Sequence, residues 1–333
     1  MQQRRLISIE GVVQGVGFRP YVHRLAAAGA LRGFVRNDAG GVLIDVEGDE
    51  DRVDEFCRQL TQAPPTLATI ARLEVAEAPL FSYSSFEITP SDAQTSPRAP
   101  ARVPPDVGTC EACLAELFDP SNRRFGHPFI TCTDCGPRFT VLREAPYDRE
   151  RTTMSTFPLC ARCQHEYDDP RDRRFHAETI ACPECGPALR ARTGPDDAGS
   201  VGFDAVRAAA AVVREGGIVA IKALGGFHLA CDATNAASVN RLRERKRRPA
   251  KPFAIMVRNE NAAADIAILS AAERATLASS ARPVILLTPR PQAFIALSVA
   301  PRSATLGVML PSTPIHHLLL AEVDRPLVMT SGN

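Results

Sequence analysis

The sequence has 333 residues, of which 45% are hydrophobic, so it is long enough to build two or three hydrophobic cores. Its 39 basic and 38 acidic residues leave a net charge of +1, which gives no field for bulk attraction to nucleic acid or membranes. No apolar run approaches the roughly 18 residues of a membrane helix. We expect no signal peptide, because residues 1–5 lead into a strand-like alternation, and we expect a reducing, cytoplasmic location.

Residues 1–90 are predicted to form a ferredoxin-like α+β domain. Alternating apolar residues indicate strands, and apolar residues three and four apart indicate helices. In chain order we expect a strand, a helix, a two-stranded hairpin, a second helix and two further strands, over residues 4–13, 19–28, 31–37, 42–48, 51–62, 70–77 and 83–89. This βαββαβ order with one extra strand is typical of the ferredoxin-like fold.

The loop between the first strand and the first helix has the features of an anion-binding site. Gly15 and Gly17 let the backbone curl, so that consecutive N–H groups can point inward at a helix N-terminus. Arg19 lies where its guanidinium can form two hydrogen bonds to a phosphate. A glycine pair alone is a weak signal, and an ordinary strand–helix turn is the alternative interpretation.

Two motifs in this region resemble those of the acylphosphatases, over residues 1–90. Residues 13–19, Val-Gln-Gly-Val-Gly-Phe-Arg, are similar to their signature, and residues 33–37, Gly-Phe-Val-Arg-Asn, are similar to their second motif. The resemblance implies that Arg19 binds the phosphoryl group and that Asn37 positions the attacking water, with no protein base. It also implies that the substrate is bound by the loop residues Gln14, Gly15, Val16, Gly17 and Phe18.

A proline-rich linker is predicted over residues 91–107, and a duplicated cysteine module follows it over residues 108–192. The module contains two units with the spacing Cys-x2-Cys-x18-Cys-x2-Cys, offset by fifty residues. Other residues repeat at the same offset, including Cys-Gly-Pro at 135–137 and 185–187. The four cysteines of each unit are Cys110, Cys113, Cys132 and Cys135, and Cys160, Cys163, Cys182 and Cys185.

This spacing predicts two structural zinc sites in a small, tandem, zinc-ribbon-like module. Two Cys-x-x-Cys turns can close a tetrahedral shell of four thiolates around Zn²⁺. Disulfides would need an oxidising compartment, a redox pair would be single, and an iron–sulfur cluster would accept the same four thiolates. Ligands exchanged between the two units are a further alternative. With four thiolates per unit, the nearby His127, His165 and His176 are not needed as ligands.

After a short linker at 193–200, residues 201–333 are predicted to form an α/β domain. We expect strands near 218–222, 252–257, 283–288, 305–310 and 327–330, and helices near 203–215, 236–246, 260–268, 270–279 and 316–322. A basic run at 241–251 is conspicuous, although on its own it would suit the solvated C-terminal end of a helix.

The context of the basic run resembles the YrdC-like nucleotide-binding fold. Lys-Arg-Arg-Pro at 246–249 is similar to the Lys-x-Arg-Pro element of that fold, and Ser-Gly-Asn at 331–333 is similar to its Ser-x-Asn element. The resemblance implies a twisted α/β domain in which Lys246 and Arg248 hold ATP phosphates with Mg²⁺. Ser331 and Asn333 would contact the nucleotide or the acyl group. Further residues that could reach the same cleft are Lys251, Lys222 and His228, although a structural role suits His228 equally well.

The order of these three parts resembles the N-terminal portion of the HypF family, the carbamoyltransferases of NiFe hydrogenase maturation. The resemblance implies that carbamoyl phosphate is hydrolysed in the first domain and that the resulting carbamate is adenylated with ATP in the third. The carbamoyl group would then pass to the C-terminal cysteine of a HypE-type partner. We expect the chain to be a fragment with an incomplete YrdC-like domain, because it stops within the Ser-x-Asn element.

An alternative is a stand-alone acylphosphatase joined to a zinc-bearing RNA- or protein-binding platform. The YrdC fold is associated with RNA binding, so binding of double-stranded RNA stays open. The near-zero net charge disfavours a nucleic-acid partner, since such binding depends on phosphate neutralisation. ATP dependence of the activity would separate the two interpretations.

Overall fold

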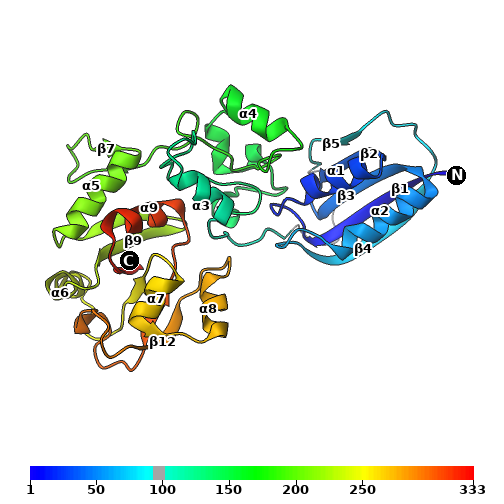
Figure 1. Cartoon of the computed structure of the whole chain (residues 1–333). Coiled ribbons are helices and arrows are strands. Elements are labelled where there is room, and N and C mark those ends of the chain that lie inside the picture. The colour runs from blue at the N-terminus through cyan, green and yellow to red at the C-terminus, as the bar shows by residue number, and fades with distance from the viewer. Residues whose placement is uncertain (93–101) are drawn as a thin grey trace. The chain divides into compact units, whose positions relative to one another are not determined.

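The computed structural model describes residues 1–92 and 102–333 (Figure 1). The described chain forms two compact units, one made of residues 1–106 and 131–185 and the other of residues 107–130 and 186–333. The predicted linker at 91–107 falls largely on residues 93–101, which lie outside the described residues. Among the described helices, none is long and apolar enough to cross a membrane.

The first unit contains the predicted ferredoxin-like sheet. In the described chain this sheet has the order β4-β1-β3-β2-β5, with antiparallel pairs except for the parallel pair of β2 and β5. Its elements are β1 (Gln2–Val12), α1 (Phe18–Ala28), β2 (Arg32–Asn37), β3 (Gly41–Asp49), α2 (Glu50–Gln62), β4 (Thr69–Ala78) and β5 (Phe86–Ile88). The predicted order of elements is therefore confirmed. Apolar residues of the strands and of both helices form one core.

Close packing between β2 and β3 fixes the strand that ends at Asn37. Gly33 pairs with Val46 and has a φ of +132°, a value that side chains rarely allow. A Cβ atom at Gly33 would lie 1.9 Å from the carbonyl oxygen of Asp45, so only glycine lets the two strands approach. The second acylphosphatase-like motif thus begins with a residue that the sheet requires.

The two cysteine units fold alike. Each unit starts a short helix directly after its first cysteine, namely α3 (Glu111–Phe118) after Cys110 and α4 (Ala161–Asp168) after Cys160. The first hydrogen bond of each helix has the same form, with the amides of Leu114 and Gln164 donating over 2.9 Å to the cysteine carbonyls. Residues between the units contain the short 3-10 helices η1 (Phe139–Val141), η2 (Arg149–Arg151) and η3 (Thr153–Thr156).

Each unit brings its four sulfur atoms within 4.8 Å of one another, so the grouping within each repeat is confirmed. In a tetrahedral Zn–S shell with bonds of about 2.3 Å, neighbouring sulfurs would lie about 3.8 Å apart. The sulfur of Cys182 lies 3.8 Å from that of Cys160 and 3.7 Å from that of Cys185. The sulfurs of Cys132 and Cys135 are 3.8 Å apart. The two groups therefore have the donors and the size that suit a tetrahedral thiophilic metal.

The second compact unit, made of residues 107–130 and 186–333, contains a seven-stranded mixed sheet within the described residues. The strand order of this sheet is β11-β12-β13-β10-β14-β9-β8. Its strands are β8 (Val219–Ala223), β9 (Gly226–Asp232), β10 (Ala254–Met256), β11 (Ala267–Ile268), β12 (Ile285–Pro289), β13 (Leu306–Met309) and β14 (Leu327–Ser331). Its helices are α5 (Phe203–Arg214), α6 (Ala236–Arg245), α7 (Glu260–Ile266), α8 (Ala271–Ala278), η4 (Leu297–Val299) and α9 (Pro314–Val323). A small hairpin of β6 (Arg190–Ala191) and β7 (Ser200–Val201) precedes α5.

Two features of this sheet differ from the sequence-based expectation. Strand β9 was not predicted, because it begins at Gly226, within a glycine pair that favours a turn. It pairs with β8 across a turn in which Gly225 has a φ of +76°. The predicted helix over 260–268 ends at Ile266, and the next two residues form the edge strand β11. The strand after Lys251 lies beside the strand before Ser331, since β10 and β14 are antiparallel neighbours.

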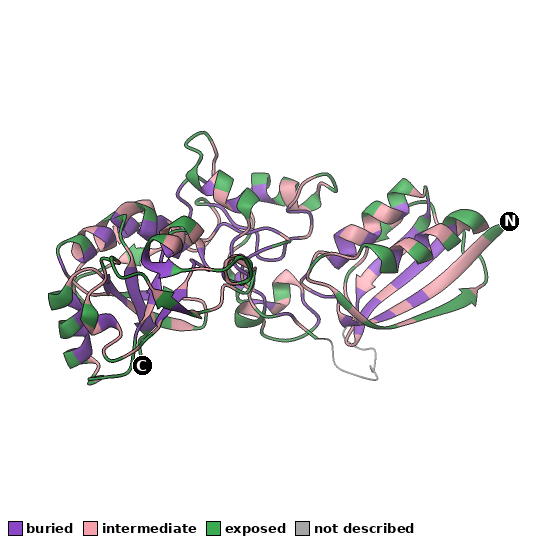
Figure 2. Cartoon of the chain, turned by 60° about the horizontal axis from the view of Figure 1, so that its bottom comes forward, coloured by how far each residue is buried: buried purple, intermediate pink, exposed green. Residues whose placement is uncertain are grey.

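Burial follows the layers of both sheets. Figure 2 shows buried residues concentrated in the strands and exposed residues along the outer faces of the helices. In the second unit the core joins Val239 and Leu242 of α6 to Ile255, Val308 and Val328 of the central strands. Thr313 caps α9 by accepting the amide of His316, and Pro314 stands at the first helical position, where its missing N–H costs nothing.

Replacing Gly33 with alanine tests the close approach of β2 and β3. The Gly33→Ala chain should lose roughly 3 kcal/mol or more of local stability, because both the positive φ and the contact with Asp45 oppose a Cβ atom. Hydrogen exchange of residues 32–49 should accelerate. Gly194→Ala is the control, because nothing lies within 4 Å of a Cβ there. Equal exchange rates in the two variants would contradict this packing.

Replacing Cys182 with serine tests the metal groups. Elemental analysis should find two metal ions in the unaltered chain and one in Cys182→Ser, because three thiolates bind far less tightly than four. Hydrogen exchange of residues 160–185 should rise, since the metal stabilises this segment. Cys57→Ser is the control, as Cys57 belongs to neither group and lies in α2. Retention of two ions in Cys182→Ser would contradict the assignment.

Candidate functional site

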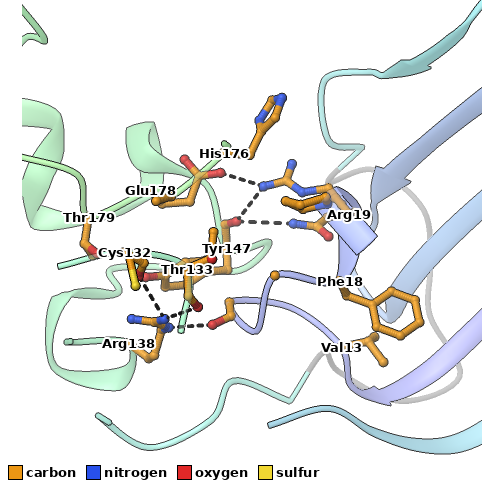
Figure 3. A pocket seen from close by; sticks show the side chains of 15 residues that line it. Val13, Phe18, Arg19, Cys132, Thr133, Arg138, Tyr147, His176, Glu178 and Thr179 are labelled. Atoms are coloured by element: carbon orange, nitrogen blue, oxygen red, sulfur yellow. Dashed lines mark hydrogen bonds and ion pairs between the residues drawn. The ribbon is translucent and has the colours of Figure 1, made fainter. Parts of the chain in front are cut away.

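A pocket lies at the loop that the sequence predicts to bind an anion (Figure 3). One wall comes from the loop itself, with Gly15, Gly17 and Arg19, and from Asn37 at the end of β2. The other wall comes from the part of the cysteine module that belongs to the same unit. Residues of that wall include Cys132, Thr133, Arg138, Tyr147, His176 and Glu178.

The loop has the curled backbone expected of an anion cradle. Gly15 and Gly17 adopt left-handed φ values of +69° and +74°, and Gly17 is the residue before α1. The side chains of Val16 and Phe18 are buried in the hydrophobic core, so these two residues can serve a ligand through their backbone N–H groups alone. The apolar side chains thus anchor the loop in the core, and its backbone N–H groups remain available to a ligand.

Gln14 ties the loop to the neighbouring hairpin and to the cysteine module. Its Nε2 donates to the carbonyl oxygens of Asp38 and Gly41, both over 2.7 Å. Its Oε1 accepts the backbone N–H of Tyr147 over 2.9 Å. Because the side chain is fully engaged and buried, Gln14 orders the site, and its amide is already committed to the protein.

Asn37 presents one free acceptor in this pocket. Only 1% of the residue is exposed, and its Nδ2 donates to the carbonyl oxygen of Tyr147 over 3.2 Å. A carbonyl can only accept, so this contact fixes which end of the Asn37 amide is nitrogen. The other end, Oδ1, is buried and has no hydrogen-bond partner in the described structure. A buried acceptor of this kind is expected to bind water or a ligand, because leaving it unpaired is costly.

Arg19 is held by two carboxylates from the cysteine module. Its Nη1 lies 2.9 Å from Asp148 Oδ1, and its Nη2 lies 2.6 Å from Glu178 Oε1. Burial favours the neutral form of Arg19, but the charges of Glu178 and Asp148 outweigh it and raise the pKa of the guanidinium. The arginine is therefore a fixed cation at the edge of the pocket, with two anions already on it.

Glu178 is itself held in place by two further donors. The backbone N–H of Arg149 donates to Oε2 over 2.9 Å, and the hydroxyl of Tyr167 donates to the same oxygen over 3.0 Å. Burial raises the pKa of the Glu178 carboxyl group, although Arg19 acts in the opposite direction. Tyr167 lies in α4, so the second cysteine unit sets the position of the carboxylate that meets Arg19.

The cysteine-module side of this pocket was missed by the sequence-based prediction, which placed the site within residues 14–19 and 37. The missing residues are Arg138, Tyr147, Asp148 and Glu178. A signal for two of them exists in the repeat. Arg138 takes the place of Ala188, and Glu178 takes the place of Pro128, at the fifty-residue offset. Where the two copies of a structural repeat differ in charge, the charged residue is a candidate for a function other than metal binding.

In the second unit, the predicted nucleotide-site residues lie partly together. Lys246 Nζ donates to the carbonyl oxygen of Ser331 and to a backbone oxygen of Asn333, each over 2.7 Å. The Ser331 hydroxyl and the Asn333 side chain are hydrogen-bonded to each other. The first basic residue of the predicted pair therefore reaches the Ser-x-Asn element, as the pairing of β10 with β14 allows.

The remaining candidates of this unit have different surroundings. Arg248 donates from Nε to the carbonyl oxygen of Lys251 over 3.2 Å and stacks on Phe253 with its guanidinium carbon 4.9 Å from the ring centre. Lys222 Nζ lies 5.1 Å from the ring centre of Phe227 across the β8–β9 hairpin. Lys251 is exposed.

His228 lies opposite Ser331 in the pairing of β9 with β14. Its Nδ1 is 3.4 Å from Nε2 of His316, and the two rings are stacked. Burial lowers the pKa of both histidines, to about 3 for His316, so this pair is neutral at physiological pH. His228 thus has a structural partner and also lies beside the Ser-x-Asn element.

Family models match the chain in three consecutive parts. A model described as Acylphosphatase matches residues 6–88, and one described as HypF finger matches residues 109–142 and 159–191. A model described as Telomere recombination, for the Sua5, YciO and YrdC proteins, matches residues 211–333. The two segments of the finger model contain the two cysteine units.

Curated relatives cover nearly all of the chain. The carbamoyltransferase HypF of Rhodobacter capsulatus is 50% identical over 328 residues, which are 98% of this chain and 43% of that protein. The carbamoyltransferase HypF of Synechocystis sp. is 47% identical over 327 residues, which are 98% of this chain and 42% of that protein. The chain therefore spans less than half the length of the curated relatives it matches.

Two solved structures agree with this chain over its whole length. A full-length HypF in the phosphate- and nucleotide-bound form superposes with a TM-score of 0.93 at 44% identity, over 100% of this chain and 43% of that one. The HypF of T. kodakarensis superposes with a TM-score of 0.89 at 42% identity, over 100% of this chain and 42% of that one. With its acylphosphatase-like, cysteine-finger and YrdC-like parts in this order, the chain belongs to the HypF family of carbamoyltransferases.

Proposed function

We propose that this chain carries the first two steps of a carbamoyltransferase. Carbamoyl phosphate is hydrolysed in residues 1–90, and the resulting carbamate is adenylated with ATP in residues 201–333. Residues 108–192 form the metal-bearing module, and residues 91–107 link it to the first domain. The observation that carries the hydrolytic step is the buried, unpartnered Oδ1 of Asn37 in the pocket that Arg19 also lines.

In the hydrolytic step, the loop amides of residues 15–18 and the guanidinium of Arg19 bind the phosphoryl oxygens. The incoming phosphoryl group exchanges with a carboxylate at Arg19, since Asp148 and Glu178 occupy that side chain beforehand. A cradle of backbone N–H groups at the start of α1 stabilises the negative charge that the phosphoryl group carries in the transition state.

Asn37 Oδ1 accepts a hydrogen bond from the attacking water and aims its oxygen at phosphorus. The new P–O bond forms as the bond from phosphorus to the carbamoyl oxygen breaks. Carbamoyl phosphate dianion and water thus yield carbamate and dihydrogen phosphate, each with one negative charge. Both protons of the water end on phosphate, so the step needs no protein base.

The two cysteine groups hold Zn²⁺ in this proposal, because four thiolates at tetrahedral spacing suit that ion. The metal is structural and leaves no position open for substrate. It joins the segments that carry Tyr147 and Glu178 to the rest of the module. We place the protein in the reducing cytoplasm, where cysteines stay available as metal ligands.

In the second step, Lys246 and Arg248 neutralise the triphosphate of Mg²⁺-bound ATP, and Ser331 and Asn333 contact the nucleotide or the carbamoyl group. A carbamate oxygen attacks the α-phosphorus, and pyrophosphate leaves. The contact of Lys246 with residues 331 and 333 supports this placement, and Lys222, Lys251 and His228 are further candidates. The phosphate and nucleotide named for a full-length HypF structure support both ligands. A longer protein of this family would then pass the carbamoyl group to the C-terminal cysteine of a HypE-type partner.

Substitution of Arg19 and Asn37 tests the hydrolytic step. Arg19→Lys keeps the charge but loses the planar pair of donors, and kcat/KM for carbamoyl phosphate should fall by roughly 10². Asn37→Ala should lower kcat about tenfold or more with a smaller change in KM, because Oδ1 acts on water and not on phosphate. Phosphate release measures both.

Arg32→Ala is the matched control for these variants, since Arg32 is an exposed arginine at the start of β2, the strand that ends at Asn37. Its kinetics should equal those of the unaltered chain. Undiminished turnover in Arg19→Lys would remove the arginine from the site, and a change confined to KM in Asn37→Ala would remove the water-positioning role.

Substitution of Lys246 tests the nucleotide step. Binding of Mg²⁺–ATP by the chain, measured by calorimetry, should weaken about tenfold in Lys246→Ala, because one phosphate-binding cation is lost. Arg245→Ala, at the exposed cation that ends α6 directly before Lys246, should bind as the unaltered chain does. In the full-length protein, carbamoyl phosphate should start exchange of labelled pyrophosphate into ATP. Exchange that ignores carbamoyl phosphate would contradict the adenylation step.

A further inference from the structure

We propose that Arg138 is a positioning residue of the hydrolytic site: it holds the phosphate-binding loop in the conformation that receives the phosphoryl group. The proposal rests on the proposed hydrolysis of carbamoyl phosphate and extends the site into the first cysteine unit. Arg138 follows Cys135-Gly136-Pro137 and lines the pocket at Gly15 (Figure 3).

The side chain of Arg138 connects the loop to a cysteine turn. Its Nε donates to the carbonyl oxygen of Gly15. Its other donors go to carbonyl oxygens around the second cysteine pair, namely those of Cys132, Thr133, Cys135 and Pro137, over 2.6 to 3.4 Å. A guanidinium has five N–H donors, so these five hydrogen bonds use its full capacity.

Arg138 is deeply buried and has a fixed orientation. Only 2% of the residue is exposed. Its backbone N–H donates to Asp106 Oδ1 over 2.8 Å, and the hydroxyl of Tyr147 donates to the neighbouring carbonyl of Pro137 over 3.3 Å. Because each of its donors is occupied and water is excluded, the guanidinium cannot turn without breaking several hydrogen bonds at once.

The contact with Gly15 determines how the loop presents its amides. The peptide that joins Gly15 to Val16 is planar and trans, so its C=O and N–H point in opposite directions. When the oxygen of Gly15 is fixed on Arg138, the N–H of Val16 faces away from Arg138. Gly15, which precedes this peptide at a φ of +69°, has no side chain and so restricts its rotation little.

A loop of this kind benefits from an external support. Its amides must already point at the phosphoryl group when the substrate arrives, since reorienting them would cost part of the binding free energy. Ala188 occupies the same position of the second cysteine unit and has no side-chain donor. The arginine thus occurs in the cysteine unit whose second Cys-x-x-Cys turn contacts the loop. The second cysteine unit folds alike without it, so the fold of a cysteine unit does not require this arginine.

The test measures the inhibition constant of inorganic phosphate in the hydrolysis of carbamoyl phosphate by the whole chain. Arg138→Met removes all donors, and Arg138→Lys keeps the charge but cannot reach both the loop and the cysteine turn. In both variants the Ki of phosphate and the KM should rise about tenfold or more, with two metal ions retained. Arg143→Met, at an exposed arginine of the same module, should leave both constants unchanged.

This readout separates positioning from a merely structural role. A structural role would reduce the number of active molecules and lower Vmax while the remaining molecules kept the original Ki and KM, and that result would overturn the inference. If Arg138→Met loses a metal ion, the Ki of phosphate and the KM measured for Arg138→Lys decide between the two roles. Unchanged constants in a chain that hydrolyses carbamoyl phosphate and depends on Arg19 overturn this inference alone. Failure of the unaltered chain to hydrolyse carbamoyl phosphate overturns the proposed function as well.

Discussion

The four-thiolate groups are the constraint on which residues 131–185 depend. This segment contains one short α-helix and three turns of 3-10 helix, and its apolar cluster around Ile180 is small. A cluster of that size contributes too little burial to offset the conformational entropy of ordering the segment. In the proposed account, metal coordination supplies the missing free energy, because structural zinc binding can contribute on the order of 10 kcal/mol to folding.

The same segment places the polar side chains of the pocket. Arg138 comes three residues after Cys135, and Glu178 comes four residues before Cys182, so both are close to a ligand along the chain. Tyr147 lies between the two cysteine units, and its backbone N–H and C=O form hydrogen bonds with the side chains of Gln14 and Asn37. A rigid support is needed here, since a shift of about 1 Å in a positioning group can cost a large factor in rate. The cysteine module is therefore both a scaffold and one wall of the proposed active site.

Arg19 illustrates how burial changes the chemistry of a predicted residue. The guanidinium of an exposed arginine is hydrated until phosphate binds, whereas Arg19 is buried and paired with Asp148 and Glu178. Such a buried cluster is costly to break from one side, because the remaining charges lose their partners. Phosphate can compete only because it brings comparable charge and geometry to the same donors. In the proposed mechanism, the carboxylates thus favour a dianion that binds the guanidinium in two places.

The sequence predicts those parts of the structure that local chemistry determines. The strand–helix order of residues 1–90, the cysteine groups and the glycine-rich loop each follow from a short pattern with a physical cause, and the structure confirms them. Strand β9 was missed because its hydrogen bonds to β8 and β14, and not its composition, make it a strand. Arg138 and Glu178 were missed for a related reason: their partners, Gly15 and Arg19, lie more than 120 residues away along the chain.

The central claim is that water held by Asn37 attacks phosphorus in a pocket closed by the cysteine module. The most direct test is hydrolysis of carbamoyl phosphate by the chain in water enriched with ¹⁸O, followed by mass analysis of the products. The account predicts one ¹⁸O atom in each inorganic phosphate released, because the new bond forms at phosphorus. Unlabelled phosphate would mean that the bond to the carbamoyl carbon breaks instead, and it would contradict the account.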